Sequence, residues 1–333
     1  KLMTNYDPEL MKCRFCSEVS KQNGEDTLGT LYPFDSWLMF EIEQPWNVNM
    51  LAKPQPIPQA AIDLIQEIHQ QQKIKFWQLA IAPDHEYSTS DNIRIFHYSR
   101  PAQLFAKYDK REYILPRELI GELIFTLYKQ PQLLTNFDKY LQDTSHIREI
   151  MVCTHGNVDV ACARFGYPIY QELRQNYACS HLRIWRCSHF GGHQFAPTLI
   201  DMPYGRSWGH LTWEILPNII YQKGDISQLR PFYRGFFGLP PFAQILEGEI
   251  WLQEEWNWYE YLKFGRILEL TEDKTEALVE VDFVSPNQEI KGKYQGIIKQ
   301  THQVITQHQS KDKNLFPIPQ YQVFNLRCLP LKE

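Results

Sequence analysis

The stretch Cys153-Thr-His-Gly-Asn-Val-Asp-Val-Ala-Cys162 contains two cysteines separated by eight residues. The later stretch His189-Phe-Gly-Gly-His193 contains two histidines separated by three residues. Two thiolates and two imidazoles make a complete set of four ligands for a metal centre. A strand-like segment precedes each pair, and parallel strands joined through a helix bring the loops that follow them to one edge of a sheet. The sequence therefore predicts that these four side chains converge.

Three interpretations of the four residues compete. In the first, the cysteines are buried fillers and the histidines are ordinary loop residues. In the second, all four bind zinc, although structural zinc sites usually take cysteines two to four residues apart. In the third, they hold a [2Fe–2S] cluster, whose two irons are separated by bridging sulfides and therefore accept ligand pairs from widely spaced positions. We favour the iron–sulfur interpretation, with Cys153 and Cys162 on one iron and His189 and His193 on the other.

Residues close to these four suggest how the loops are built. Gly191 and Gly192 allow positive φ and a close backbone approach. Two consecutive glycines also cost about 2 kcal/mol of helix propensity, so the histidines are expected in a loop. His155 can donate a hydrogen bond to the cluster or act as an alternative ligand, or it can be a solvated loop histidine. Asp159 can orient a ligand histidine, but capping of a turn is the favoured role.

Composition limits the class of protein. The 333 residues carry a net charge of −5 with acids and bases well mixed, and no basic tail indicates a nucleic-acid partner. The longest apolar stretch, 118–128, is interrupted by two glutamates and is too short to cross a bilayer, so no transmembrane segment is expected. The chain start lacks the apolar run of a signal peptide. Seven cysteines are an odd, sparse count, which is typical of a reducing compartment such as the cytoplasm.

The pattern of apolar residues predicts the same element order, β-α-β-β-β-α, in two halves of the chain. In the first half the segments are 37–43, 60–71, 76–82, 93–98, 113–115 and 117–129. In the second half they are 147–153, 168–177, 182–187, 197–202, 207–210 and 211–222, with Pro168 at the first position of its helix. Parallel strands followed by a hairpin give a mixed sheet covered by helices, which is the thioredoxin-like arrangement. The predicted fold class is therefore α/β with mixed sheets.

We expect three parts. Residues 1–145 form a lead and a cluster-free thioredoxin-like domain, and residues 146–225 form the thioredoxin-like domain that carries the cluster. Residues 226–333 form an extension with an aromatic helix at 242–262, a small β-meander and a polar loop at 307–319. Within the lead, Cys13-x-x-Cys16 has no partner pair, so Cys16 is interpreted as packing and Cys13 as incidental. Cys179, Cys187 and Cys328 are expected as small core residues.

The motifs Cys153-Thr-His-Gly-x-x-Asp-x-x-Cys162 and His189-x-Gly-Gly-His193, followed by Phe195-Ala, resemble the sucrase/ferredoxin-like family, a branch of the thioredoxin-like [2Fe–2S] ferredoxins. In ordinary members of the wider group a Cys-x3-Cys pair stands where the two histidines stand here. The likeness extends over the chain up to about residue 240, and it includes Cys16-Ser-Glu-Val-Ser, Gly29-Thr, Trp37-Leu and Tyr233-Arg-Gly. The resemblance implies a cluster ligated by two cysteines and two histidines.

Neutral imidazoles in place of thiolates make such a cluster less negative, which raises its potential as it does in Rieske centres. Free ring nitrogens on the histidines can titrate and so couple proton transfer to electron transfer. We therefore expect a soluble electron carrier or redox sensor, rather than a catalyst, that exchanges electrons with partner proteins. The alternatives are a zinc-stabilised interaction protein, or a thiol oxidoreductase that uses Cys153 assisted by His155.

Overall fold

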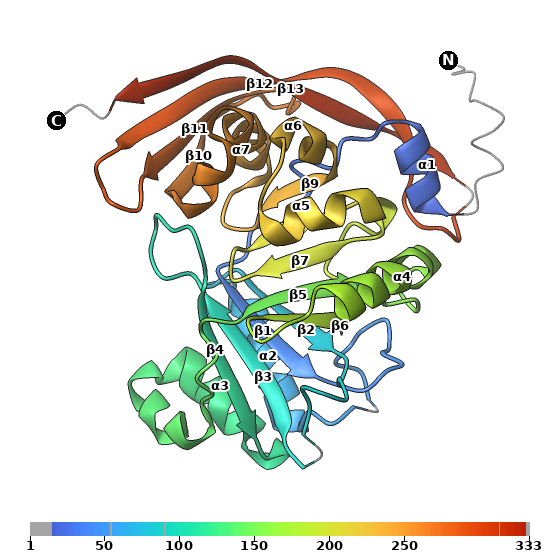
Figure 1. Ribbon diagram of the computed structural model, residues 1–333, viewed down its shortest axis with the longest axis vertical. Helices are drawn as coiled ribbons and strands as arrows, with labels where there is room; N and C mark the ends of the chain where they lie inside the picture. Colours follow the sequence, from blue (N-terminus) through green and yellow to red (C-terminus); the bar gives the residue numbers. More distant parts are fainter. Residues whose placement is uncertain (1–14, 54, 90, 313, 331–333) are drawn as a thin grey trace.

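The computed structural model describes residues 15–53, 55–89, 91–312 and 314–330, and its centre is a large mixed sheet with helices on both faces (Figure 1). The first set of elements after the short helix α1 (Cys16–Gln22) is β1 (Ser36–Glu41), α2 (Gln59–Gln71), β2 (Phe76–Ile81), β3 (Ile93–Ser99), β4 (Asp109–Leu115) and α3 (Ile120–Lys129). The second set is β5 (Arg148–Cys153), α4 (Val160–Asn176), β6 (Leu182–Cys187), β7 (Leu199–Met202), β8 (Arg206–Trp208) and α5 (Leu216–Tyr221). Both sets have the predicted order, and the mixed sheets and helices confirm the α/β class.

The strands of the large sheet follow the order β4-β3-β1-β2-β6-β5-β7-β8-β9, where β9 is Tyr233–Phe236. The pairs β1–β2 and β5–β6 are parallel, and the other neighbouring strands are antiparallel. The order β4-β3-β1-β2 of the first set therefore recurs as β8-β7-β5-β6 in the second. The two sets join edge to edge, where β2 and β6 pair at Ile81 and Cys187. Their description as tandem thioredoxin-like domains with boundaries at 145 and 225 stays a prediction.

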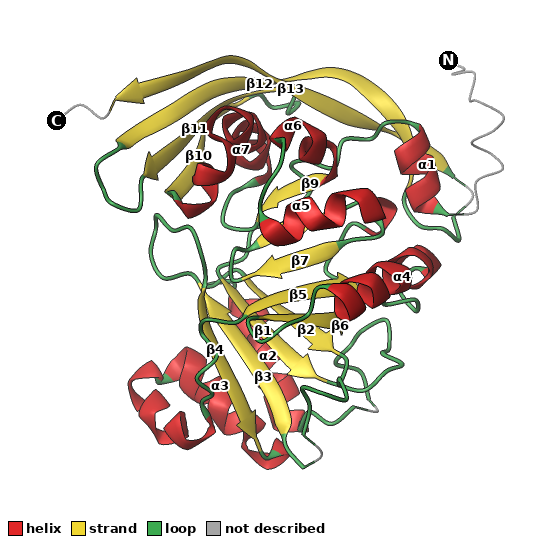
Figure 2. Cartoon of the chain, in the orientation of Figure 1, coloured by secondary structure: helices red, strands yellow, loops and turns green. Residues whose placement is uncertain are grey.

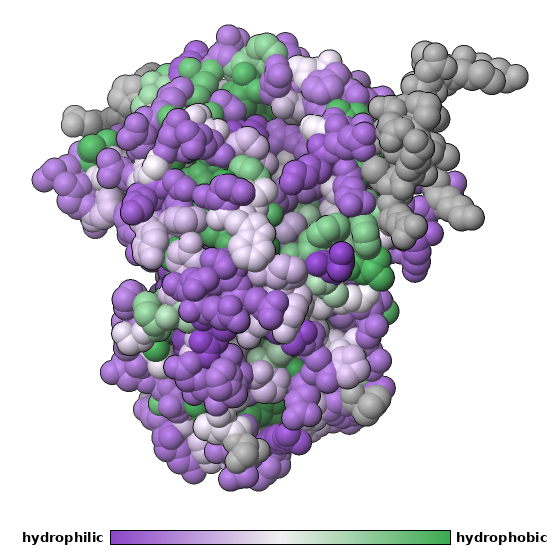
Figure 3. Space-filling model, turned by 45° about the vertical axis from the view of Figure 1, so that its right-hand side comes forward, coloured by the Kyte–Doolittle hydropathy of each residue, from purple (hydrophilic) through white to green (hydrophobic). Residues whose placement is uncertain are grey.

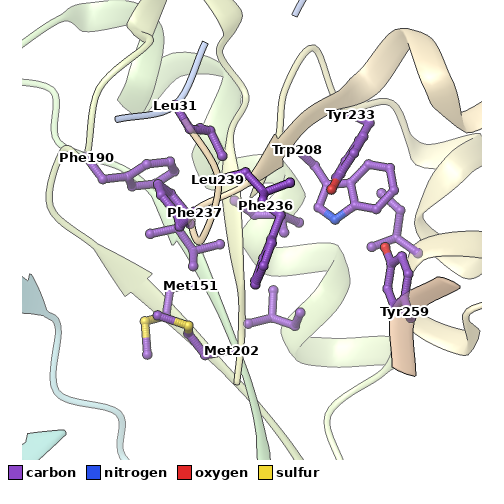
Figure 4. Packing of buried hydrophobic residues seen from close by; sticks show 14 of the residues in the cluster. Leu31, Met151, Phe190, Met202, Trp208, Tyr233, Phe236, Phe237, Leu239 and Tyr259 are labelled. Carbon is purple, nitrogen blue, oxygen red and sulfur yellow. The ribbon is translucent and has the colours of Figure 1, made fainter. Parts of the chain in front are cut away.

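The helices cover the sheet from two sides. Figure 2 shows α4 and α5 in front of β5 and β7, whereas α2 lies behind β1 and β3. The helices α2 and α3 pack on a core of their own with one face of the first set of strands. The opposite face belongs to a larger core that continues through the second set into the C-terminal part. Figure 4 shows Phe190, which lies between the two motif histidines in the sequence, beside Leu31 and Phe237 in this larger core.

The C-terminal part is a four-stranded antiparallel sheet packed on one helix. It consists of α7 (Pro241–Glu254), β10 (Leu262–Leu270), β11 (Glu276–Val284), β12 (Lys291–Gln307) and β13 (Leu315–Pro330). Figure 1 shows the long β12–β13 pair arching over α7 and reaching α1 at its far end. Thr306 there donates a hydrogen bond to Glu25, and the Asn23 side chain donates to the Ile305 carbonyl. The far end of the hairpin is thus fastened to the segment that follows α1.

Several predicted elements were wrong in their bounds; the helix expected at 211–222, for example, spans Leu216–Tyr221. The helix expected to begin at Pro168 begins eight residues earlier, and Pro168 lies inside it. The loop expected at 307–319 is shorter, because β12 extends to Gln307 and β13 begins at Leu315. The aromatic helix expected at 242–262 ends at Glu254 and continues as a 3₁₀ turn over Glu255–Glu260.

The face drawn in Figure 3 is mostly hydrophilic, with hydrophobic side chains in small groups. No helix within the described residues is both long enough and apolar enough to cross a membrane.

Candidate metal centre

Both motif cysteines lie at the carboxyl edge of the parallel pair β5–β6. Cys153 is the last residue of β5 and stands opposite Cys187, the last residue of β6. Cys162 lies in the first turn of α4, whose N-cap Asp159 accepts a hydrogen bond from the Ala161 amide. Both motif cysteines are 1% exposed. The strand end and the helix start therefore hold two buried sulfurs close to each other.

His189 completes a group of three possible ligands with these cysteines. It follows β6 by two residues, and its Nδ1 lies 4.0 Å from the Cys153 sulfur and 3.8 Å from the Cys162 sulfur. The three ligand atoms all lie within 4.8 Å of one another. The positive φ angles expected for Gly191 and Gly192 are confirmed at 96° and 79°. They turn the chain from His189 into the short 3₁₀ segment that begins at His193.

His193 lies beside His189, with 5.3 Å between the ring centroids, but its Nδ1 faces a different group. This nitrogen is 3.6 Å from the Cys16 sulfur and 3.9 Å from an Asp159 oxygen. Cys16, Asp159 and His193 are all buried and form a second set of possible ligands. The structure therefore brings Cys153, Cys162 and His189 together, whereas His193, whose ring lies beside that of His189, belongs to the second group.

The tip of the β12–β13 hairpin closes the second group. Ser310 donates a hydrogen bond to Asp159 Oδ1 at 2.5 Å and lies 3.3 Å from the Cys16 sulfur. The Cys16 amide donates to Ser310 Oγ at 3.1 Å. The His308 ring meets the His193 ring edge to face, with 5.5 Å between centroids. Asp159 thus has the predicted capping role and a second role in binding the hairpin.

His155 is a buried support for the histidine loop, so its interpretation as a solvated residue is wrong. Its side chain is 3% exposed, and its Nδ1 accepts a hydrogen bond from the His189 amide at 3.2 Å. Its Nε2 lies 3.3 Å from the Trp46 carbonyl, and the two rings meet edge to face. Trp46 lies in the loop after β1, and this loop corresponds to the loop after β5 in the second set. The half of the chain without motif cysteines therefore supports the site of the other half.

Arg234 on β9 is a buried cation next to the histidine loop. It is 1% exposed, and its Nη1 donates to the Gly191 carbonyl at 3.0 Å. Its Nε and Nη2 donate to the side chain and the carbonyl of Thr30. A Cβ atom on Gly192 would lie 2.2 Å from Arg234 Nη2, so the guanidinium occupies the space that a side chain would need.

Burial and close contacts shift several pKa values at the site. The hydrogen bond from Cys162 lowers the pKa of Cys153, and His189 lowers it further, although burial acts in the opposite direction. The same hydrogen bond, together with burial, raises the pKa of Cys162. Burial lowers the pKa of His193 to about 4 and that of His155 below its ordinary value. Burial raises the pKa of the Cys16 thiol to about 12. The site therefore favours the Cys153 thiolate and the neutral His193 imidazole, which are metal-binding forms.

A cavity of about 660 Å³ reaches both motif histidines from the outside. It is bordered by the segment 25–32, the histidine loop, the start of α7 and the hairpin tip. A Cβ atom on Gly191 would meet nothing within 4 Å, so this backbone faces open space. His189 is partly exposed here, whereas the two cysteines are enclosed.

Sequence reasoning missed several residues of the site. Cys16 was expected to be packing only, and Ser310, His308 and Arg234 were not assigned. Tyr233-Arg-Gly was noted only as part of a resemblance, which was the one signal for Arg234. The expected core role is right for buried Cys187 and wrong for exposed Cys179 and Cys328. Cys13 lies outside the described residues.

The donor set fits an iron–sulfur or a zinc centre. Thiolates and imidazoles are ligands for both, and the Cys153, Cys162 and His189 donor atoms face one another without an intervening side chain. His155 accepts a hydrogen bond from the His189 amide and so fixes the loop of this candidate ligand.

The fold and this group define a mixed α/β protein with paired thiols and imidazoles at the carboxyl edge of a parallel strand pair. The chain belongs to the sucrase/ferredoxin-like family, whose sequence model matches residues 27–235. This confirms the family that the motifs indicated. The matched residues include all four motif cysteines and histidines and end within β9, so α7 and the second sheet lie beyond them.

A curated relative is altered inheritance of mitochondria protein 32 of Meyerozyma guilliermondii. It is 26% identical over an alignment of 133 residues, and the match covers 32% of this chain and 46% of the relative. The similarity thus spans less than half of the length of that protein. No solved structure matches the chain.

Proposed function

We propose that the protein is a [2Fe–2S] electron-transfer or redox-sensing protein, with Cys153 and Cys162 on one iron and His189 and His193 on the other. The observation that supports this most is the approach of His189 Nδ1 to both sulfurs, at 3.8 and 4.0 Å, with the His193 ring beside it. Membership of the sucrase/ferredoxin-like family agrees with this assignment.

Such a cluster, when bound, accepts and releases single electrons. The residues of the chain supply the surroundings that this needs. The cysteines are enclosed, which keeps water from the sulfurs, and His155 holds the amide of His189. Neutral imidazoles leave the centre less negative than four thiolates would, so we propose a potential above that of all-cysteine relatives. A ring nitrogen that does not bind iron can hold a proton, which couples the potential to pH.

The partners in this proposal are redox proteins. The cavity of about 660 Å³ brings a partly exposed His189 to the surface, so a partner that docks there is close to the centre. The cysteines of the described residues are all unpaired. This supports a reducing compartment such as the cytoplasm as the place of action.

Anaerobic purification followed by iron, sulfide and zinc analysis tests the proposal. We expect a red-brown protein with two irons and two sulfides per chain, which dithionite bleaches and which then gives an electron paramagnetic resonance signal. Its potential should change with pH between about 6 and about 10, because histidines titrate in that range. A colourless protein with one zinc would refute the redox role, and a metal-free protein with a reactive Cys153 would favour a thiol oxidoreductase.

His189→Cys and His193→Cys test the histidine assignment. Each variant should keep a cluster and lower its potential, because a thiolate adds negative charge where an imidazole adds none. His85→Cys is a matched control on a histidine whose side chain is 89% exposed, and it should leave the spectrum and the potential unchanged. If neither motif variant alters the resonance spectrum, the histidines are not ligands.

A further inference from the structure

Arg234 differs from the other buried arginines in its electrostatic partners. The buried Arg94, Arg183 and Arg206 each form ion pairs with glutamates. No carboxylate oxygen of the described residues lies within 4.0 Å of the Arg234 guanidinium, whose hydrogen bonds go to Gly191 and Thr30. A buried charge without an opposite charge costs several kcal/mol, so the position calls for an anion nearby.

The groups around Arg234 show where that anion belongs. Burial lowers the pKa of this guanidinium to about 9, and the charges that oppose the shift are those of Cys153, Cys162 and Glu25, in that order. The rings of Phe190 and Phe195 lie 5.9 and 5.3 Å from its central carbon and exclude water from it. The Cys153 thiolate is therefore the leading negative group that this cation faces in a site of low polarity.

We propose that Arg234 is a positioning residue of the centre, which fixes the histidine loop and stabilises the state that carries one extra electron. The inference rests on the proposed function. Two ferric irons, two sulfides, two thiolates and two neutral imidazoles together carry no net charge. One electron from a donor such as dithionite makes the centre an anion, and a cation in a site of low polarity then attracts it.

The fork of hydrogen bonds explains why the cation is an arginine. One arm of the guanidinium donates to the Gly191 carbonyl, and the other two donors reach Thr30. Its plane fills the space above Gly192, where a Cβ atom would clash. Lysine carries the same charge as a single point and cannot make this set of bonds. Substitution by lysine, which keeps the charge, and by glutamine, which removes it, can therefore separate the charge of Arg234 from its role in placing the histidine loop.

Redox titration of Arg234→Gln and Arg234→Lys, followed by electron paramagnetic resonance, tests the inference. For Arg234→Gln we expect the equilibrium constant for reduction to fall about tenfold, which is about 59 mV for one electron. Arg234→Lys should lower the potential less, because it keeps the charge. Arg266→Gln is a control that removes the same charge from a partly exposed arginine on β10, and it should leave the potential unchanged.

The outcomes separate this inference from the proposed function. A wild-type protein without iron and sulfide refutes the proposed function and, with it, this role of Arg234. A fully loaded Arg234→Gln variant with the wild-type potential refutes the role of the Arg234 charge but leaves the proposed function intact. Equal shifts in the Gln and Lys variants refute it as well. If both variants keep the wild-type melting temperature but cannot hold iron and sulfide, Arg234 only places the loop and the charge claim is wrong.

Discussion

At the scale of single residues, spacing along the chain predicted the part of the site that is local. Cys153, Cys162 and His189 lie within one strand-helix-strand unit, whose geometry brings strand ends together whatever the rest of the chain does. Cys16 and Ser310 could not be predicted in this way, because they are 294 residues apart and meet only in the folded protein. A single buried arginine likewise gives no periodic pattern. The only sequence signal for Arg234 was therefore the Tyr233-Arg-Gly motif of the family resemblance.

The glycine pair gives a prediction at this scale. Both residues have positive φ, so alanine at either position costs about 1–2 kcal/mol of backbone strain. Gly191→Ala should cost no more than this, because its Cβ atom meets nothing within 4 Å. Gly192→Ala should cost clearly more, since it must also displace the Arg234 guanidinium. Urea unfolding of the two variants measures the difference, and equal free energies of unfolding would contradict the contact.

At the scale of elements, periodicity predicted the strands and their order. The start of one helix and the extent of one loop were predicted wrongly from local residues. Proline at a helix start is favoured, so Pro168 indicated an N-terminus. The helix instead begins beside the capping Asp159 and passes so close to β5 that a Cβ atom on Gly166 would lie 2.0 Å from the Cys153 carbonyl oxygen. The loop expected at 307–319 took in the start of β13, because Pro317 and Pro319 are typical of loops, whereas both residues lie in β13 and face β12.

The hairpin tip gives a prediction at the scale of elements. Ser310→Ala removes hydrogen bonds to Asp159 and to the Cys16 amide, so the free energy of unfolding should fall by about 1–2 kcal/mol. Hydrogen exchange should become faster in α1 and in the first turn of α4. Ser285→Ala is the matched control, because Ser285 makes two similar bonds in a turn after β11. The Ser310 amide still donates to Asp159 in this variant, so unchanged exchange at the start of α4 would show that the Ser310 hydroxyl does not hold the helix.

At the scale of the whole molecule, a buried network of charges joins the two sets of strands. Arg183 on β6 binds both Glu112 on β4 and Glu149 on β5, and Lys110 on β4 also binds Glu149. The repeated element order was predictable, but the sequence did not reveal this connection, because its members come from four separate strands once Arg94 on β3 is included. The two sets are therefore coupled by charge as well as by the β2–β6 pairing.

Glu112 gives a pH prediction for this network. Burial alone would raise its pKa, but the hydrogen bond and charge of Arg183 outweigh burial and hold the pKa below its ordinary value of 4.5. A lowered folded-state pKa means that the stabilisation is present above that ordinary value and is lost as pH falls through the folded-state pKa. Glu112→Gln should cost about 3 kcal/mol at neutral pH, and this difference should shrink in acid.

Urea unfolding of both proteins from pH 7 downward measures this effect. Glu67→Gln is the control, since Glu67 is an exposed glutamate whose ion pair with Lys129 lies on the surface, and it should change little at any pH. A gap between wild type and Glu112→Gln that stays constant with pH would contradict the assignment.

The contact of the β12–β13 hairpin with the site has a consequence for shortened forms of the protein. A shortened protein that stops at residue 235 keeps every position of the family match, including the four motif residues. It nevertheless loses the serine that touches Cys16 and Asp159 and the imidazole that meets the His193 ring edge to face. Expression of that fragment should yield an exposed, unsupported site, so a fragment that keeps this site intact must include the tip of the β12–β13 hairpin.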